Sequence, residues 1–370
     1  MIDFSLNVAS LFDGENILSN RTIHVKDGRI EQITKNISGK DALLGMLVPG
    51  YIDVQVNGGG GFLFNQTPTP QTIEKIGKAH QKFGTTGWLP TLVTDSIEQM
   101  QKAADAVAAS IKNEIPGVLG IHFEGPFLSV EKKGVHSEAL IRAISEAEIE
   151  ILIRKDLGKV VVTLAPEHVS PEQIAMLVRE GIIVCLGHSN ATFEQTKLAL
   201  EAGATGFTHL FNAMSSLSSR EPGVVGAALL DENSYAGLIL DGIHVHADTA
   251  RLAFKLKEKL MLVTDAMPTV GTDETQFEFF GDIIQRRGLT LTDSQGRLAG
   301  SALDMNSAVK NAVEMFAIEK IEAINLASAN PAKFLGLSDD YGNLKLGAKA
   351  SMILLDKDGN ISNLWIDGKN

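Results

Sequence analysis

The middle of the chain alternates apolar, β-rich runs with amphipathic segments, and this alternation constrains the fold more than any other feature. Helical patterns such as SIEQMQKAADAVAASIKN and ATFEQTKLALEAG lie between the apolar runs. The runs number eight: Leu47–Val56, Thr86–Thr91, Val118–Glu124, Val160–Ala165, Ile182–Gly187, Gly206–His209, Ala236–Asp241 and Leu260–Asp265. Such alternation predicts βα units around a parallel sheet. Eight units over residues 49–340 match a (β/α)₈ TIM-type barrel of the α/β class, with an open doubly wound sheet as the alternative.

The two ends of the chain have a different pattern. Residues 1–48 alternate apolar and polar side chains between the turn signals Asp13-Gly14 and Asp27-Gly28. Residues 341–370 repeat this character. We therefore expect the N- and C-terminal segments to form one small β-sandwich domain beside the barrel of residues 49–340. A stretch around residues 268–300, after the eighth run, is expected to be a hairpin insertion.

Composition excludes several classes of protein. The 370 residues carry a formal net charge of −12, which argues against a nucleic-acid-binding surface. The sequence has neither a signal-peptide pattern nor an apolar run of the ~18 residues that a membrane span needs, so no membrane partner is expected. The single cysteine, Cys185, excludes an internal disulfide and is typical of a cytoplasmic protein.

Polar residues stand where the predicted strands end, and in a barrel the carboxyl ends of the strands converge on one mouth. Glu124 ends the third run, His188 follows the fifth, His209 ends the sixth and Asp265 ends the eighth. One carboxylate and two imidazoles suit a divalent metal with an open position for water. Such an ion lowers the pKa of bound water and polarises a carbonyl. Asp265 is then the predicted proton acceptor and donor beside that water.

Other histidines are weaker candidates for the site. His122 shares a strand face with Glu124 and is expected behind the ligands or in the core. His168 follows the fourth run and could reach the mouth. His244 and His246 form an H-x-H pair, but they follow the seventh run, so we expect no second metal there.

Several motifs, in chain order, carry a family likeness. PGYIDVQVNGGGG, HFEGPFLS, GHSNATFEQ, THLFNAM, REPGVVGAAL, DGIHVH and LVTDAM together resemble the N-acetylglucosamine-6-phosphate deacetylase family of the amidohydrolase superfamily. The resemblance implies hydrolysis of the acetamido group of N-acetyl-D-glucosamine 6-phosphate to D-glucosamine 6-phosphate and acetate, in amino-sugar catabolism.

The resemblance also implies roles for individual residues. Glu124, His188 and His209 would bind the metal, Asp265 would act as general base and then acid, and His136 would hydrogen-bond the substrate near the scissile amide. The implied substrate contacts are Val135, His136, Asn212, Ala213, Arg220, Asp241, His244, Leu298, Ala299 and Gly300. Members of this family are dimers with a phosphate contact from the neighbouring subunit, so Arg220 and His244 are expected to work in a homodimer.

One position departs from the superfamily pattern. Many amidohydrolases carry H-x-H at the end of the first strand for a second metal, whereas this chain has Gln55-Val56-Asn57. We therefore expect one divalent ion per subunit, zinc first, with iron, cobalt or manganese as alternatives. A weak second ion near Gln55 and Asn57 stays open. Two other functions also stay open: deacetylation of another N-acetylhexosamine phosphate such as the galactosamine epimer, and a catalytically silent scaffold of this fold.

Overall fold

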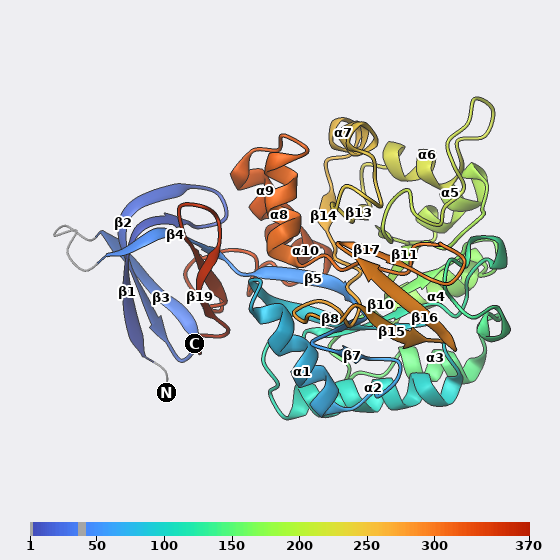
Figure 1. Ribbon diagram of the computed structural model, residues 1–370, viewed down its shortest axis with the longest axis horizontal. Coiled ribbons are helices and arrows are strands. Elements are labelled where there is room, and N and C mark those ends of the chain that lie inside the picture. Colours follow the sequence, from blue (N-terminus) through green and yellow to red (C-terminus); the bar gives the residue numbers. More distant parts are fainter. Residues whose placement is uncertain (1–2, 36–41) are drawn as a thin grey trace.

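The protein consists of a barrel and a smaller sheet that lies at one side of it (Figure 1). The computed structural model describes residues 3–35 and 42–370. Residues 36–41 of the predicted β domain lie outside the described part of the chain. Both ends of the chain belong to the smaller sheet, so the predicted combination of a barrel with a terminal β domain is confirmed. The domain boundaries predicted at residues 48/49 and 340/341 stay a prediction.

The barrel contains eight parallel strands in the order β14-β13-β12-β11-β10-β9-β8-β5. Their bounds are β5 Tyr51–Val56, β8 Thr85–Val93, β9 Gly120–Glu124, β10 Lys159–Leu164, β11 Ile183–Leu186, β12 Gly206–Phe207, β13 Tyr235–Leu238 and β14 Leu260–Leu262. The first and last strands are joined just beyond their carboxyl ends, where the Asp265 N–H donates to Gln55 O (3.0 Å) and the Asn57 N–H donates to Ala266 O (3.0 Å). Because this link closes the ring, the open-sheet alternative is wrong.

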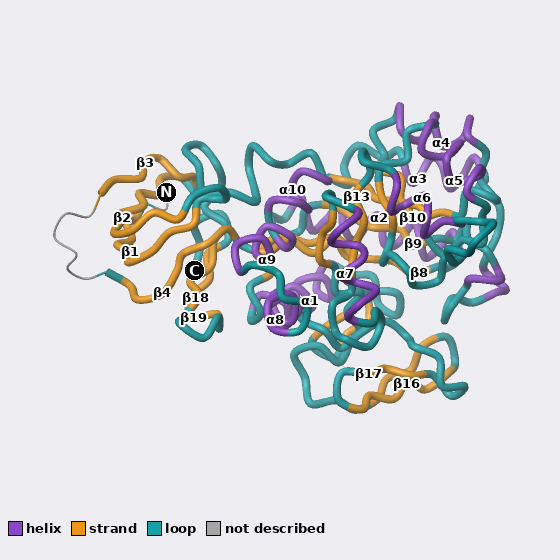
Figure 2. The backbone as a smooth tube through the Cα atoms, turned by 90° about the horizontal axis from the view of Figure 1, so that it is seen from above, coloured by secondary structure: helices purple, strands orange, loops and turns teal. Residues whose placement is uncertain are grey.

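Helices surround the barrel strands on the outside (Figure 2). Seven connect consecutive barrel strands and three follow the insertion: α1 Pro70–Gln81, α2 Ile97–Lys112, α3 Glu146–Leu152, α4 Pro171–Arg179, α5 Phe193–Glu201, α6 Gly223–Leu230, α7 Ala247–Leu256, α8 Met305–Glu314, α9 Lys320–Ala327 and α10 Ala329–Phe334. The helix-start signals in the sequence act as caps. Ser170 and Thr192 each accept a hydrogen bond from the N–H group three residues on, and the glutamine there bonds back to the capping residue. Short elements complete this part: β6 Gly58–Gly59, β7 Phe62–Leu63 and the 3₁₀ turns Val130–Lys132 and Glu138–Leu140.

The smaller sheet has six strands in the order β19-β18-β4-β1-β2-β3, hydrogen-bonded into a single sheet. Their bounds are β1 Phe4–Phe12, β2 Ile17–Lys26, β3 Arg29–Lys35, β4 Leu43–Pro49, β18 Met352–Leu355 and β19 Ile361–Trp365. The prediction of one strand over Leu47–Val56 is wrong, because β4 ends in this sheet and β5 begins in the barrel. The chain crosses at Gly50, where a Cβ would lie 2.1 Å from Thr86 Oγ1. Only glycine fits this close approach.

The insertion after β14 is a three-stranded antiparallel sheet of β15 Gln276–Phe279, β16 Asp282–Arg287 and β17 Thr290–Thr292. The expected hairpin is therefore wrong by one strand, because a tight turn at Gly288 returns the chain to pair again with β16. Phe279, Ile284 and Leu291 form a small core with Met267 at the barrel mouth. The Ser301 N–H then donates to Asp265 O (2.9 Å), which returns the chain to the end of β14. The insertion thus brings residues 297–300 to the mouth.

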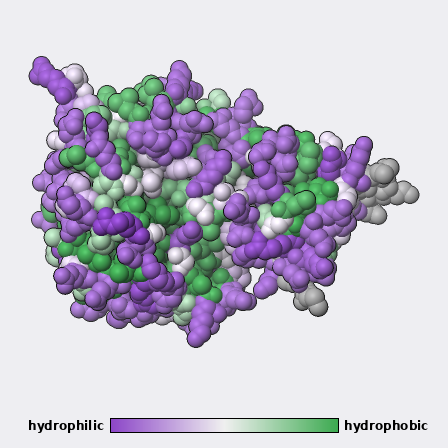
Figure 3. All heavy atoms as spheres, turned by 180° about the vertical axis from the view of Figure 1, so that it is seen from behind, coloured by the Kyte–Doolittle hydropathy of each residue, from purple (hydrophilic) through white to green (hydrophobic). Residues whose placement is uncertain are grey.

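The surface in Figure 3 is mostly hydrophilic, with hydrophobic side chains showing between polar ones on the barrel. In the described part of the chain, no helix combines the length and apolar character needed to cross a bilayer.

A buried carboxyl group lies at the seam where the barrel closes. Asp53 on β5 accepts hydrogen bonds from the Thr264 hydroxyl (2.5 Å) and from the Gln55 N–H (3.1 Å). Its side chain is fully buried, and this burial raises the pKa of Asp53 to about 7. The folded protein therefore holds this proton up to about pH 7, whereas the unfolded chain releases it near pH ~4.

We predict that Asp53→Asn makes stability less dependent on pH. In the wild type, the protonated Asp53 makes its full contribution to the free energy of unfolding below about pH 4. This contribution is lost as the pH rises to about 7, by up to roughly 1.4 kcal/mol per pH unit. The asparagine cannot ionise, so this slope should disappear. Urea unfolding at pH 4.5, 5.5 and 6.5 measures it, and equal slopes for the two proteins would contradict the assignment.

Candidate metal centre

The polar residues at the mouth follow strands whose backbone turns sharply. His188, His209 and Asp265 have φ of +47°, +31° and +52°, a left-handed conformation that costs roughly 1–2 kcal/mol for a residue with a Cβ. Glu124 is followed by Gly125 at φ +85°. Strain of this kind at three strand ends marks a site that the surrounding fold holds in place.

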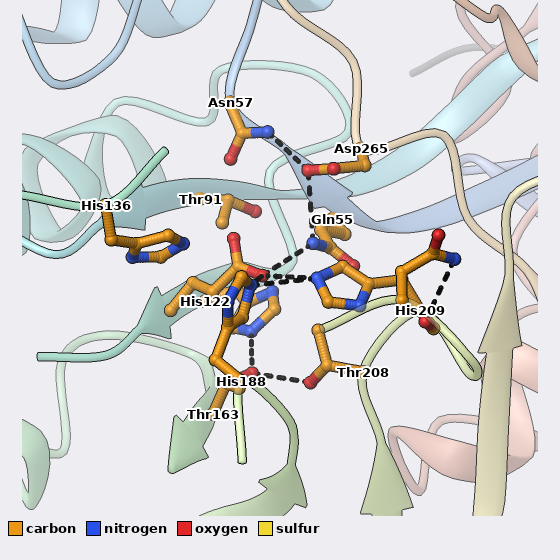
Figure 4. A network of polar contacts seen from close by, with 12 residues as sticks. Gln55, Asn57, Thr91, His122, His136, Thr163, His188, Thr208, His209 and Asp265 are labelled. Atoms are coloured by element: carbon orange, nitrogen blue, oxygen red, sulfur yellow. Dashed lines mark hydrogen bonds and ion pairs between the residues drawn. The ribbon is translucent and has the colours of Figure 1, made fainter. Parts of the chain in front are cut away.

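Three ligand atoms converge within this ring of strand ends (Figure 4). Glu124 Oε1 lies 3.1 Å from His209 Nε2 and 3.3 Å from His188 Nε2, and the two nitrogens are 3.0 Å apart. All three side chains are buried. One atom from each residue lies within 4.8 Å of the other two, which is a suitable arrangement for a metal ion.

The donor chemistry of this trio fits a cation. His188 Nδ1 lies 2.9 Å from Lys132 O, a carbonyl that can only accept, so Nδ1 carries the proton. In the neutral imidazole, Nε2 then has a lone pair directed at the Glu124 carboxylate, which also only accepts. Two acceptors facing each other at 3.3 Å need a positive charge between them. The hydrogen bond to Lys132 also fixes the ring, as is usual for histidines that bind metals.

Electrostatics favour an ionised carboxylate at this point. Burial opposes ionisation of Glu124, but the close approach of the His188 and His209 rings outweighs it and holds the pKa of Glu124 well below its usual range. Burial also disfavours the charged form of His209, yet the neighbouring Glu124 raises the pKa of His209 above its ordinary value. The site thus carries a buried negative charge that a cation can neutralise.

Asp265 lies beside the trio and is held by two amide side chains, Gln55 and Asn57 (Figure 4). Asn57 Nδ2 donates to Asp265 Oδ1 at 2.6 Å and Gln55 Nε2 donates to the same oxygen at 3.1 Å. Gln55 Nε2 also donates to Glu124 Oε1 at 2.9 Å. Burial, together with the charge of Glu124, raises the pKa of Asp265 to about 6. The sequence predicted only that Gln55 and Asn57 replace the H-x-H pair of a second metal; their role as donors to Asp265 was missed.

His136 approaches the trio from the loop after β9, with its ring centroid 4.3 Å from that of His188. Its Nδ1 lies 2.7 Å from the hydroxyl of Thr94, a residue that was not predicted from the sequence. Burial, with His188 nearby, keeps the pKa of His136 well below its usual value, so the ring is neutral. The contact with Thr94 fixes the ring and leaves Nε2 for another partner.

The three candidate metal ligands, Asp265 and His136 line a pocket of about 340 Å³. Seven of the predicted substrate contacts lie on its wall: Val135, His136, Asn212, Ala213, His244, Leu298 and Gly300. Asp241 lies behind His244 and accepts from its Nδ1 at 2.6 Å, so it orients that ring. Ala299 is fully buried in the core of the insertion. Lys132 and Arg297 also line the pocket, and neither was predicted from the sequence.

Three further predictions concern residues outside the pocket lining. Arg220 is exposed and does not line the pocket of its own chain. His122 is buried between Val54 O (3.0 Å) and Thr163 Oγ1 (2.7 Å), in the barrel core as expected. His168 is exposed and does not line the pocket.

The chain is similar to known proteins over most of its length. Residues 46–370 match the amidohydrolase family. The chain is 48% identical to an N-acetylgalactosamine-6-phosphate deacetylase of Shewanella sp. (strain ANA-3) over 96% of this chain and 92% of that protein. It is 36% identical to the N-acetylglucosamine-6-phosphate deacetylase of Haemophilus influenzae, over 87% of this chain and 86% of the relative. The crystal structure of the N-acetylglucosamine-6-phosphate deacetylase from Pasteurella multocida superposes with a TM-score of 0.94 at 36% identity, covering 99% of both chains.

We predict that Glu124→Ala abolishes tight metal binding while the barrel stays folded, because the two imidazoles alone leave the ion without a charged ligand. Elemental analysis of purified protein should find one ion per wild-type chain and far less than one in the variant. Glu131→Ala is the matched control, since Glu131 is an exposed carboxylate at the pocket rim and should leave the metal in place. Two tightly bound ions per wild-type chain, or full occupancy in Glu124→Ala, would contradict the assignment.

We also predict that Asn57→Leu lowers kcat roughly ten- to hundredfold for a reaction in which Asp265 transfers a proton, because Asp265 loses its shortest hydrogen bond and its fixed orientation. Metal content should change little, since no metal ligand is altered. Steady-state kinetics together with metal analysis test this. A variant with wild-type kcat would show that the amide does not orient Asp265.

Proposed function

Since the chain belongs to the amidohydrolase family, we propose that it removes the acetyl group from an N-acetylhexosamine 6-phosphate. The first candidate substrate is N-acetyl-D-glucosamine 6-phosphate, which gives D-glucosamine 6-phosphate and acetate. The observation that carries the proposal is the convergence of Glu124, His188 and His209 beside Asp265 in one pocket. The names of the relatives and of the superposed crystal structure support this substrate class.

The chain's own residues supply the proton transfers in this scheme. Glu124, His188 and His209 would hold a divalent ion, which would lower the pKa of water and polarise the acetamide carbonyl. Asp265 accepts the proton of the attacking water and later delivers it to the leaving amine. Gln55 and Asn57 hold Asp265 in one orientation through these steps. His136 Nε2 is free to hydrogen-bond the substrate next to the scissile amide. Zinc is the first candidate ion, with iron, cobalt or manganese as alternatives.

The second candidate substrate is the galactosamine epimer, N-acetyl-D-galactosamine 6-phosphate. The observation in its favour is the 48% identity to a deacetylase named for that sugar, against 36% for the relative from Haemophilus influenzae named for the glucosamine compound. Both substrates present the same acetamide to the same catalytic residues.

The remaining parts of the proposal concern assembly and location. Arg220 lies on the surface outside the pocket, which suits a residue that contacts phosphate in the pocket of a partner subunit. We therefore propose a homodimer in which Arg220 and His244 together bind the phosphate. The single, buried cysteine is compatible with the reducing cytoplasm, where sugar phosphates are found.

We predict that the wild type, saturated with zinc, releases acetate from at least one of the two epimeric sugar phosphates. Asp265→Asn should lower kcat by roughly 10²–10⁴, because it removes the general base and acid. Asp358→Asn, in an exposed turn of the smaller sheet, is the control and should keep full activity. An enzyme-coupled acetate assay with both epimers measures these rates and ranks the two substrates.

Two outcomes would contradict the proposal. Absence of acetate from both substrates would favour the silent scaffold. Equal rates for the wild type and Asp265→Asn would remove Asp265 from the proton transfers.

A further inference from the structure

Arg297 places a guanidinium at the boundary between two adjoining chambers. It lines both the 340 Å³ pocket of the metal ligands and a neighbouring cavity of about 250 Å³ beneath the insertion. Val135 and His136 are the other residues that line both spaces. The insertion therefore supplies this chain's own pocket with a permanent positive charge close to His136.

The orientation of Arg297 is fixed by a buried carboxylate, Asp293. Asp293 Oδ2 accepts from Arg297 Nε at 2.6 Å, and Oδ1 accepts from the backbone N–H groups of Gln295 (2.9 Å) and Arg297 (2.8 Å). The Asp293 N–H donates back to Arg297 O at 3.0 Å, which closes the turn. The Asp293 side chain is 2% exposed, whereas that of Arg297 is 46% exposed. The anchored end is thus Nε, and the two terminal nitrogens form no hydrogen bond with any residue of the described ranges 3–35 and 42–370.

A structural ion pair alone does not account for this arrangement. A half-exposed pair contributes little to stability, and Asp293 already completes the turn through backbone N–H groups. A guanidinium with two unused nitrogens in a fixed direction matches two neighbouring oxygen atoms of a ligand. In a chain with a net charge of −12, an anionic ligand needs such a local cation.

We propose that Arg297 is a substrate-binding residue, and that its terminal nitrogens donate hydrogen bonds to oxygen atoms of the sugar phosphate. This contact rests on the proposed function, because it assumes a sugar-phosphate substrate. It adds a residue that recognises the substrate and that belongs to the same chain as the pocket. The oxygen atoms belong either to ring hydroxyls or to the phosphate, and both kinds of oxygen can accept hydrogen bonds from the two terminal nitrogens of Arg297. Unlike Arg220, Arg297 would bind the substrate in the pocket of its own chain, without a partner subunit.

The test compares three variants on both epimeric sugar phosphates. Arg297→Gln should raise KM roughly ten- to hundredfold, as expected for loss of hydrogen bonds from a charged donor. Its kcat should stay within about threefold of the wild type and its metal content should be unchanged, because no metal ligand or proton-transfer group is altered. Arg297→Lys keeps the charge beside Asp293 but lacks the fork, so its KM should lie between the two. Arg287→Gln, the same charge change at an exposed site of the insertion, should leave KM unchanged.

Competitive inhibition by inorganic phosphate identifies the oxygen atoms. If Arg297 binds the phosphate group, the inhibition constant of inorganic phosphate should rise in Arg297→Gln together with KM. If Arg297 binds ring hydroxyls, KM should rise while that inhibition constant stays the same, and the ratio of kcat/KM between the two epimers should shift when a contacted hydroxyl is the one at C4.

A KM within twofold of the wild type for Arg297→Gln and Arg297→Lys, on every substrate that the wild type hydrolyses, would overturn the proposal. So would equal KM increases in Arg297→Gln and Arg287→Gln, since the cause would then be the net charge. These results are distinct from failure of the proposed function, in which the wild type itself releases no acetate from either epimer.

Discussion

Two imidazole nitrogens and a carboxylate oxygen meet at one buried point, and most other features of the molecule serve to hold them there. These atoms lie 3.0–3.3 Å apart, with the proton of His188 committed to the Lys132 carbonyl. Without a positive charge between them, such atoms would repel each other in a buried environment. The left-handed backbone of His188 and His209 shows that the fold accepts local strain to keep this convergence.

The seam between the first and last barrel strands places two amide side chains beside the carboxylates of the site. Many amidohydrolases use this place to hold another ion, whereas here Gln55 and Asn57 direct N–H groups at Asp265 and Glu124. The amides therefore stabilise carboxylates, as a cation would, but through hydrogen bonds. Asp53 and Thr264 lie just beneath and tie the same two strands together, so barrel closure and the orientation of Asp265 depend on one small region.

The sequence predicted the barrel and the places of Glu124, His188, His209 and Asp265, because strand-end positions in a parallel barrel converge whatever the side-chain details. Other features depended on information that no local pattern carries. The break at Gly50 was hidden because strands on both sides of it are apolar, and only the contact with Thr86 makes glycine necessary. The donor role of Asn57 could not be predicted, because Asn57 and Asp265 are far apart in the sequence and meet only where the first and last barrel strands join.

The residues that line the pocket show the same division between what the sequence predicts and what only the fold reveals. Motif likeness identified His244 and Asn212, which line the pocket, and also Arg220, which lies outside the pocket of its own chain. Arg297 was missed because its position depends on how the three-stranded insertion folds back over the mouth. An arginine in a polar loop has no sequence signal that separates a ligand contact from a surface charge.

We propose that Glu124, His188 and His209 hold one divalent ion and that the chain binds no second ion tightly. Anomalous diffraction from crystals of the zinc-loaded protein, measured on both sides of the zinc absorption edge, tests it most directly. We expect a single strong peak per chain at about 2.0–2.2 Å from Glu124 and the Nε2 atoms of both histidines. A peak of similar height between Gln55 and Asn57, or no peak at the histidines, would contradict it.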